Sequence, residues 1–407
     1  MSGLLSMDEV AARLRAQAMP ITGVETVALR DAAGRWLARD LMSAIDVPAT
    51  DTSAMDGYAL RAADIAGGGS RLVVSQRLFA GDRSAPLVAG TAARIFTGAS
   101  LPPGADCVVM QELAREEDGE VSIDERPAPG QFVRRRGEDV ARGAVVLTAG
   151  TRLDARHLGL SASIGLAEVP VWRRLRVALL CSGDELHPPG SVLPDGGVYN
   201  SNRDLIAALL DTLQMEVLDM GVVRDEPEAV RDALSAAAAA ADVIVCCGGV
   251  SVGEADHVRA VVEAIGRLDL WRVAIKPGKP LAFGRIAQTD FFGLPGNPVS
   301  AFVTFVLLVR PFLEQRQGGV FRGPEGTSLR ADFDWPSVTR EGTERTESRR
   351  EFLRARRNPA GGLDLFPNQG SATLASLSWA DGLVDKPPGQ RIRAGDTVRF
   401  LPWSALC

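Results

Sequence analysis

The chain has 407 residues, of which 46% are hydrophobic, and this length and composition suit about two to four domains with extensive cores. Its formal net charge is −6, which excludes the clustered positive surface that coats nucleic acid or anionic membranes. An anionic ligand therefore requires a local binding site.

The N-terminal sequence MSGLLSMDEVAARLRAQA has early acidic residues and an amphipathic helical pattern, unlike a signal peptide. The best apolar run, residues 301–308, is too short to span a bilayer. We therefore expect a cytoplasmic protein with no membrane segment. The cysteines have no metal-binding spacing and are expected to be buried, unreactive thiols. They are Cys107, Cys181, Cys246, Cys247 and Cys407.

Residues 70–150 contain short β-type runs, such as RLVVSQRLF, AARIFTG and AVVLTAG, that Gly and Pro interrupt about every ten residues. This pattern predicts a small β-rich insertion. Residues 173–317 instead alternate apolar strands with amphipathic helices, which predicts an α/β unit with a mixed or parallel sheet. Residues 320–407 are again β-like and rich in turns, as in RREFLRARR, GLDLFP and DTVRFL, which predicts a compact, barrel-like β domain.

Within the α/β unit we expect strands at LRVALLC, MEVLDMG, DVIVCC, LWRVAI, LAFGRI and DFFGL. A helix should follow Asn200 or Ser201, either of which could cap it, and another should begin near Pro227. Two more helices are expected at HVRAVVEAIG and from Pro298 to about Glu314. Ligands of such sheets bind at the carboxyl ends of the strands, so the loops there are the candidate site.

The loop GGVSVGEAD, residues 248–256, follows the strand DVIVCC. Gly248, Gly249 and Gly253 would let the backbone approach an anion, and Asp256 stands near the next helix. Carboxylates beside a phosphate site commonly hold Mg²⁺. Alternatively, Glu254 and Asp256 only favour the helix N-terminus.

Three further loops beside predicted strands also carry polar or charged residues. CSGDELHPPG adds the acids Asp184 and Glu185. AIKPGKP places Lys276 and Lys279 around a Pro-Gly turn, where two ammonium groups would attract an oxyanion. GLPGNPVSAF opens the last helix, with Asn297 as the expected cap, Pro298 in the first turn and Ser300 as a hydroxyl donor. Together these loops predict an oxyanion or phosphate pocket beside metal-binding acids.

Eight motifs in this order closely resemble the molybdopterin molybdenumtransferases, the MoeA and gephyrin E-domain family, over about residues 5–405. They are TSAMDGYA, RIFTGASLPPGAD, RRRGEDV, CSGDELHPPG, YNSNRDL, GGVSVGEAD, KPGKP and GLPGNPVSAF. The resemblance implies molybdate insertion into adenylyl-molybdopterin with Mg²⁺-dependent release of AMP. It also implies an elongated homodimer of four-domain subunits with the site at the subunit interface.

The resemblance assigns roles to individual residues. Glu185 and Asp256 would serve substrate and Mg²⁺, and Asp225 would join the metal site, although a helix-cap role for Asp225 is equally open. Lys276 and Lys279 would bind molybdate. The remaining cofactor-binding candidates are Ser182, Gly248, Gly249, Ser251, Gly253, Pro295, Asn297, Pro298, Ser300 and Ser371.

An arginine of RREFLRARR, either Arg350 or Arg354, would join the molybdate site. Asp56, Thr97 and Asp139 would reach the site from the partner subunit. The matching domains are residues 1–45 with 141–172 as an N-terminal dimerisation and linker domain, 46–140 as the β-rich insertion, 173–320 as the α/β molybdopterin-binding domain, and 321–407 as the C-terminal β-barrel domain.

Three alternatives stay open at this point. The chain could adenylylate molybdopterin, because the enzyme that does so resembles residues 173–317, or it could be a non-catalytic scaffold. Tungstate could replace molybdate, since the two oxyanions have nearly equal size and charge. A molybdopterin adenylyltransferase and the enzymes that receive the cofactor are expected partners, whereas nucleic acid and membranes are not.

Overall fold

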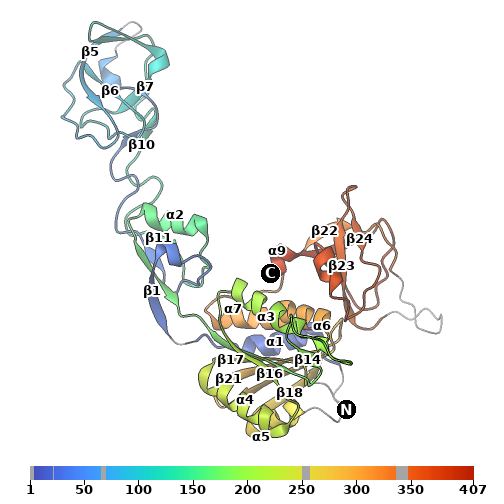
Figure 1. Ribbon diagram of the computed structural model, residues 1–407. Helices are drawn as coiled ribbons and strands as arrows, with labels where there is room; N and C mark the ends of the chain where they lie inside the picture. Colours follow the sequence, from blue (N-terminus) through green and yellow to red (C-terminus); the bar gives the residue numbers. More distant parts are fainter. Residues whose placement is uncertain (1–3, 22, 66–69, 250–256, 336–346) are drawn as a thin grey trace. The chain divides into compact units, whose positions relative to one another are not determined.

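The computed structural model describes residues 4–21, 23–65, 70–249, 257–335 and 347–407. The chain forms two compact units. The larger comprises residues 1–25, 34–36 and 172–407, and the smaller comprises residues 26–33 and 37–171. Strands β1 (Val24–Ala28) and β12 (Glu168–Trp172) carry the chain between them (Figure 1). The finer division into four domains stays a prediction.

The larger unit is built around a mixed sheet with strand order β16-β13-β17-β21-β20-β18. The first four strands are parallel, whereas β20 pairs antiparallel with both β21 and β18. Their bounds are β13 (Arg176–Ser182), β16 (Glu216–Val223), β17 (Val243–Cys247), β18 (Arg267–Arg272), β20 (Pro280–Ile286) and β21 (Thr289–Leu294). The mixed α/β sheet predicted from the alternating pattern is confirmed.

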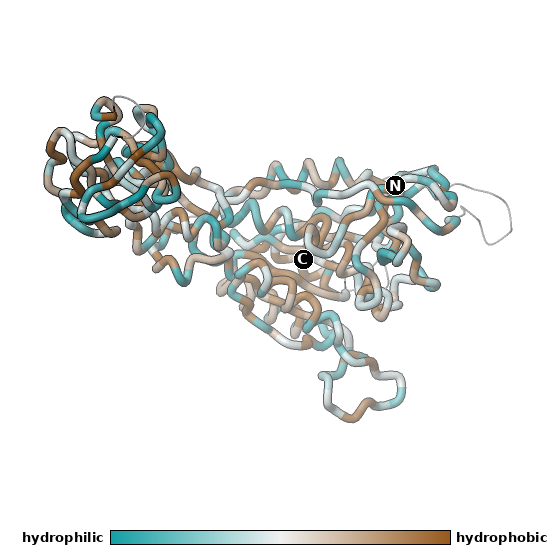
Figure 2. The backbone as a smooth tube through the Cα atoms, turned by 90° about the horizontal axis from the view of Figure 1, so that it is seen from above, coloured by the Kyte–Doolittle hydropathy of each residue, from teal (hydrophilic) through white to brown (hydrophobic). Residues whose placement is uncertain are grey.

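Helices cover both faces of this sheet (Figure 1). One face packs on α4 (Pro227–Ala240) and α5 (His257–Ile265). The other packs on α1 (Met7–Gln17), α3 (Ser201–Thr212), α6 (Pro298–Thr304) and α7 (Arg310–Arg316). Figure 2 shows hydrophobic positions gathered on the inner segments of this unit. Burial of these two faces supplies the main hydrophobic stabilisation of the unit.

Local signals explain where the helices begin. Asn200 caps α3, with its side chain accepting from the N–H of Arg203, as predicted. Pro227 opens α4, where its missing N–H leaves no bond unmade. The predicted last helix is interrupted by a π-helical turn, Phe305–Val309, between α6 and α7.

The segment Pro298–Arg316 is long and apolar enough to cross a membrane, so the apolar length inferred from residues 301–308 alone was too short. However, 78% of its apolar window is buried inside the protein, and among the described residues no other helix meets the same criteria. It is therefore a core helix. The predicted burial of the cysteines is confirmed for four of the five residues, whereas Cys407 is exposed at the chain end.

A second sheet contains the C-terminal strands in the order β19-β23-β25-β26-β22, with β24 also paired to β23. Its elements are β19 (Ile275–Lys276), β22 (Thr327–Arg330), β23 (Arg350–Arg357), β24 (Leu363–Leu365), α8 (Ala375–Trp379), β25 (Gly382–Lys386), β26 (Thr397–Pro402) and α9 (Trp403–Leu406). The predicted strand LWRVAI is therefore wrong as one element. Residues 273–274 leave the first sheet because their backbone bonds to Lys279 and Leu5, and β19 then joins the C-terminal sheet.

The smaller unit is rich in β structure, as predicted. Its main sheet has the order β7-β4-β6-β5-β9-β8. The elements are β2 (Leu41–Met42), β3 (Thr52–Ser53), β4 (Gly57–Leu60), β5 (Ser70–Leu78), β6 (Thr91–Ile95), β7 (Cys107–Met110), β8 (Ala114–Glu117), β9 (Glu120–Ile123), β10 (Val133–Arg134), β11 (Val145–Leu147) and α2 (Ala155–Ser163). Gly57 is required in β4, because a Cβ there would lie 1.9 Å from the carbonyl oxygen of Val109.

Candidate functional site

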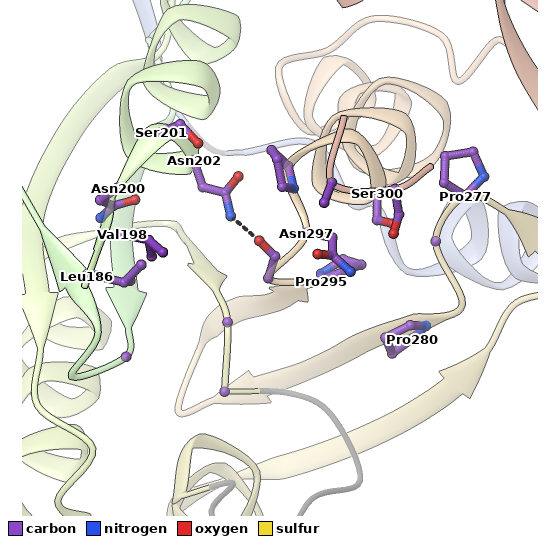
Figure 3. Close-up of a pocket in the computed structure, with 18 of the residues that line it drawn as sticks. Leu186, Val198, Asn200, Ser201, Asn202, Pro277, Pro280, Pro295, Asn297 and Ser300 are labelled. Atoms are coloured by element: carbon purple, nitrogen blue, oxygen red, sulfur yellow. Dashed lines mark hydrogen bonds between the residues drawn. The ribbon is translucent and has the colours of Figure 1, made fainter. Parts of the chain in front are cut away.

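A cavity of about 1110 Å³ opens in the larger unit, where the loops that follow β13, β17 and β21 meet the β19 turn and residues 369–372. Figure 3 shows Asn202, Asn297 and Ser300 among the side chains around it. Many of the predicted site residues line this cavity: Ser182, Glu185, Asp225, Gly248, Gly249, Lys276, Lys279, Pro295, Asn297, Pro298, Ser300 and Ser371. The carboxyl ends of the parallel strands therefore form one site, as the sheet topology requires.

Two loops each place a carboxylate at the cavity, Glu185 from the loop after β13 and Asp225 from the loop after β16. The hydroxyl of Ser182 donates to the carboxylate of Asp225. The backbone N–H of Asp225 donates to Asp184 at 3.2 Å, so Asp184 holds the turn instead of lining the cavity. The alternative role of Asp225 as a helix cap is wrong, because Glu226 occupies the cap position of α4.

Gly248 and Gly249 pack the loop after β17 tightly against its neighbours. Both have positive φ, +89° and +63°. A Cβ on Gly248 would lie 2.6 Å from the carbonyl oxygen of Ser182, and one on Gly249 would lie 2.5 Å from a methyl of Val258. The positions therefore need glycine for two independent reasons. Ser251, Gly253, Glu254 and Asp256, which were predicted to continue this loop into the metal site, lie outside the described residues.

Magnesium would find suitable oxygen ligands at the acidic end of the cavity. Within the described ranges no cluster of three or more His, Cys, Asp or Glu side chains could enclose a metal ion. Mg²⁺ does not need such a cage, because it takes one or two carboxylates and completes its shell with phosphate oxygens and water. Glu185 and Asp225 fit that requirement, with Asp256 untested.

The lysines of the KPGKP turn differ in their surroundings. Lys276 Nζ lies 3.0 Å from Glu351 Oε1 and 3.7 Å from Glu347 Oε2, with 43% of its side chain exposed. Lys279 is exposed, and it forms no ion pair with any residue that the structure describes. Both lysines line the cavity, but the ammonium of Lys276 is anchored by two carboxylates, whereas Lys279 is exposed.

The start of α6 forms another part of the cavity wall. Asn297 holds the N-cap position of α6, but its side chain makes no capping bond, so that part of the prediction is wrong. Ser300 is 4% exposed. The N–H of Val299 donates to the carbonyl of Ser371 at 3.1 Å, which binds the C-terminal loop to this helix. Asn202 donates to the carbonyl of Gly296 at 2.7 Å (Figure 3).

The arginine at the cavity is Arg349, which the sequence analysis did not single out. Glu347 accepts two bonds from its guanidinium, at 2.9 and 3.0 Å. Arg350 and Arg354, the expected candidates, do not line the cavity. Arg350 pairs with Asp385 through bonds of 2.6 and 2.7 Å. Arg349 directly precedes β23, and no sequence signal separates it from its neighbours.

Arg354 is fully buried and binds neutral acceptors, among them Ser376 Oγ and the carbonyl of Gly370, each at 3.1 Å. Burial lowers the pKa of Arg354 to about 10, so the guanidinium is still charged at neutral pH. Because Gly370 lines the cavity, Arg354 supports the loop that carries Ser371 without contacting the site itself.

Asp56, Thr97 and Asp139 all belong to the smaller unit. The carboxylate of Asp56 accepts from the backbone N–H and from the hydroxyl of Thr97, both at 2.8 Å. These bonds lower the pKa of Asp56, the backbone bond most. Asp139 is exposed, and its backbone N–H donates to the carbonyl of Val47 at 3.0 Å. The structure thus brings Asp56 and Thr97 together.

Three family models match the chain in succession. They are the "MoeA N-terminal region (domain I and II)" over residues 5–165, the "Probable molybdopterin binding domain" over residues 178–315, and the "MoeA C-terminal region (domain IV)" over residues 337–403. The matches cover both units, and the second contains β13, β17 and β21, whose loops form the cavity.

Two relatives and a solved structure belong to the family that these models describe. The chain is 44% identical over 317 residues to the molybdopterin molybdenumtransferase of Haemophilus influenzae, covering 77% of this chain and 78% of that one. It is 35% identical to that of Synechococcus elongatus, over 92% and 93% of the two chains. A crystal structure of the molybdopterin biosynthesis MoeA protein from Pyrococcus horikoshii matches 98% of this chain and 99% of its own, with 31% identity and a TM-score of 0.80. The chain therefore belongs to the MoeA family of molybdopterin molybdenumtransferases.

Proposed function

We propose that this cavity inserts molybdate into adenylyl-molybdopterin, with Mg²⁺-dependent release of AMP. The observation that carries the proposal is that one cavity is lined by the cations of Lys276, Lys279 and Arg349 and by the carboxylates of Glu185 and Asp225. Cations suit an oxyanion, whereas carboxylates suit a metal ion on a pyrophosphate. The substrate pair of molybdate and a nucleotide-bearing pterin needs both kinds of group.

At the cationic wall, Lys276, Lys279 and Arg349 would offset the charge of the molybdate dianion, and the hydroxyls of Ser300 and Ser371 would donate hydrogen bonds to its oxygens. Holding the oxyanion beside the dithiolene of the pterin makes the reaction effectively intramolecular. Each thiol would lose its proton as its sulfur bonds to molybdenum, and the displaced oxygen would take that proton and one more from solvent to leave as water. No covalent enzyme intermediate is needed.

At the acidic end, Glu185 and Asp225, together with the predicted ligand Asp256, would hold Mg²⁺ against the pyrophosphate. The bound ion would offset the negative charge that develops when water cleaves the pyrophosphate and AMP leaves. Ser182 keeps Asp225 in place through its hydrogen bond. Gly248 and Gly249 let the loop at this end pack closely on Ser182 and Val258.

We further infer that a second copy of the chain completes the site with Asp56, Thr97 and Asp139, and that the enzyme works in the cytoplasm. Asp56 and Thr97 are hydrogen-bonded to each other, which would present them as one ligand-binding element. A homodimer would then contain two sites, each made from both subunits.

A complementation experiment tests these proposals together. Lys279→Ala and Asp56→Ala should each abolish molybdate-dependent AMP release while leaving the circular dichroism spectrum unchanged. Lys279→Arg, which keeps the charge, is the matched control and should retain activity. When the two inactive variants are mixed in equal amounts and exchange subunits at random, half of the dimers are mixed, and each of these has one intact composite site out of two, so about one quarter of the wild-type activity should return.

Full activity of Lys279→Ala would contradict the assignment of the oxyanion site. If Lys279→Ala is inactive but no activity returns on mixing, the site is not shared between subunits. AMP release that does not depend on molybdate would contradict the insertion reaction.

A further inference from the structure

The chain has only three lysines among its 45 lysine and arginine residues, and two of them, Lys276 and Lys386, pair with the same carboxylate. Lys276 and Lys279 line the cavity, whereas Lys386 does not. Lys386 ends β25 and is fully buried, directly opposite Glu351 in the antiparallel register of β23 and β25. A lysine is rarely fully buried unless it is paired, so a nearby carboxylate must offset the charge of Lys386.

That partner is Glu351, whose side chain is 2% exposed. Its Oε2 lies 2.9 Å from Lys386 Nζ and accepts a bond from the indole N–H of Trp335 at 3.1 Å. Its Oε1 lies 3.0 Å from Lys276 Nζ. Burial alone would raise the pKa of Glu351, but the bonds from Lys386 and Lys276 outweigh it and hold the pKa below its usual value. Glu351 is therefore a carboxylate shared by two lysines.

The sharing decides how much positive charge remains at the cavity. Glu347 accepts from Arg349 and also lies 3.7 Å from Lys276. Among the residues that the structure describes, the cations of Lys276, Lys386 and Arg349 therefore face two carboxylates, those of Glu347 and Glu351, and one positive charge is left over. Without Lys386, the two carboxylates would cancel Lys276 and Arg349 completely. Of the described cations that line the cavity, only the exposed Lys279 would then attract an anion without an opposing carboxylate.

We propose that Lys386 is a charge-balancing and positioning residue for oxyanion binding. It neutralises Glu351, so that Glu351 fixes the ammonium of Lys276 at the cavity wall without cancelling its attraction for molybdate. The inference rests on the proposed function of the cavity and adds to it a residue that touches no substrate. Stability alone does not account for Lys386, because a buried ion pair is often no better for stability than an apolar or neutral pair of similar volume.

Three variants of the full chain separate this role from a purely structural one. Lys386→Met removes the balancing charge and leaves Glu351 to cancel Lys276. Glu351→Gln removes the carboxylate while keeping an oxygen for Lys276. The double variant Lys386→Met/Glu351→Gln restores the wild-type charge of the cluster. Arg285→Met serves as the matched control, because Arg285 is also an ion-paired cation, with Asp290, but does not line the cavity.

Binding of molybdate, with tungstate as a second probe, is measured by titration calorimetry at low and moderate ionic strength. We expect Lys386→Met to weaken binding about tenfold, Glu351→Gln to bind at least as tightly as wild type, and the double variant to return close to wild type. The difference should shrink as salt is added. Arg285→Met should bind normally.

Unchanged binding by folded Lys386→Met would overturn the inference, as would a double variant that binds as weakly as the single one. If Lys386→Met does not fold, Glu351→Gln carries the test, and a tenfold loss there would show that Glu351 acts by position only and overturn charge balancing. Failure of the wild-type protein to bind either oxyanion would instead refute the proposed function, and the charge-balancing role with it.

Discussion

Substitution of Gly278 by alanine should damage both stability and the site, because Gly278 lies between the two lysines of the KPGKP turn. Its φ is +95°, in the left-handed region that alanine disfavours. A Cβ there would lie 2.8 Å from Thr304 Oγ1 and 3.5 Å from the carbonyl oxygen of Ser300. Thr304 is buried and β-branched, so its side chain has little freedom to move away.

The two effects can be worked out separately. The left-handed backbone conformation costs alanine about 1–2 kcal/mol. Forcing an extra methyl group into the packed wall adds about 1–3 kcal/mol, the usual range for overpacking. We therefore expect Gly278→Ala to lower the free energy of unfolding by about 2–5 kcal/mol. Any relaxation has to move the turn, and with it Lys276 and Lys279, so oxyanion binding should weaken as well.

Two other glycines provide controls that isolate each effect. Gly190 has a φ of +87°, and no atom lies within 4 Å of the place that a Cβ would occupy, so Gly190→Ala should show the backbone cost alone. Gly296 has neither a positive φ nor a close neighbour, so Gly296→Ala should be nearly neutral for stability. Urea unfolding followed by tryptophan fluorescence gives the three free energies. Equal losses in Gly278→Ala and Gly190→Ala would refute the argument from the Thr304 contact.

Two further predictions concern buried charges. Burial raises the pKa of Asp242, but bonds from Arg173 and from the N–H of Arg176 outweigh it and lower the pKa overall. The carboxylate therefore stabilises the fold above its unfolded pKa of about 3.9, and this contribution is lost as the pH falls through the lower folded pKa. The free energy of unfolding of Asp242→Asn at pH 7 should be about 1–3 kcal/mol lower than that of the wild type, and its stability should depend less steeply on pH in acid. An unchanged dependence of stability on pH would contradict this prediction. Arg354→Met should lower the free energy of unfolding, measured by thermal unfolding, by about 2–4 kcal/mol, because it leaves the carbonyl of Gly370 and other buried acceptors unpaired. It should also weaken oxyanion binding. Normal stability together with normal binding would contradict the supporting role of Arg354.

Periodicity was sufficient to predict most of the α/β unit. The strands β13, β16 and β17 and the helices α3 and α4 were predicted within one or two residues, because the strands have apolar patterns and the helices also begin with a cap or a proline. The short strands at Leu186–His187 and Val198–Tyr199 were not predicted. The strand LWRVAI was predicted wrongly for a physical reason. Local pattern describes the residues of one segment, whereas the partner strand decides which sheet they join, and β19 pairs with β23 about 75 residues later.

The candidate site was predictable where a loop follows a strand. Glycines, acids and lysines in such loops lie at the cavity because the carboxyl ends of parallel strands share one edge. Arg349 was missed because RREFLRARR contains several arginines that look alike in the sequence. Only tertiary structure shows that Arg350 pairs with Asp385 and that Arg354 is buried in the core, so that neither lines the cavity. The anchoring of Lys276 was missed as well, since Glu351 and Lys386 read as ordinary charged residues of β strands in the sequence.

These contacts make the C-terminal sheet a part of the cavity wall. The register of β19 against β23 places Lys276 beside Glu351, and Arg349 directly precedes the same strand. The adjoining strand β25 supplies Lys386. The hydrogen bond from the N–H of Val299 to the carbonyl of Ser371 holds the loop between β24 and α8 against α6. A change in the pairing of β19 with β23 would therefore move Lys276 and alter the charge around it at once. The α/β unit alone carries the acidic end of the cavity but lacks Arg349, Ser371 and the carboxylate that anchors Lys276, so the proposed oxyanion site needs residues from both sheets.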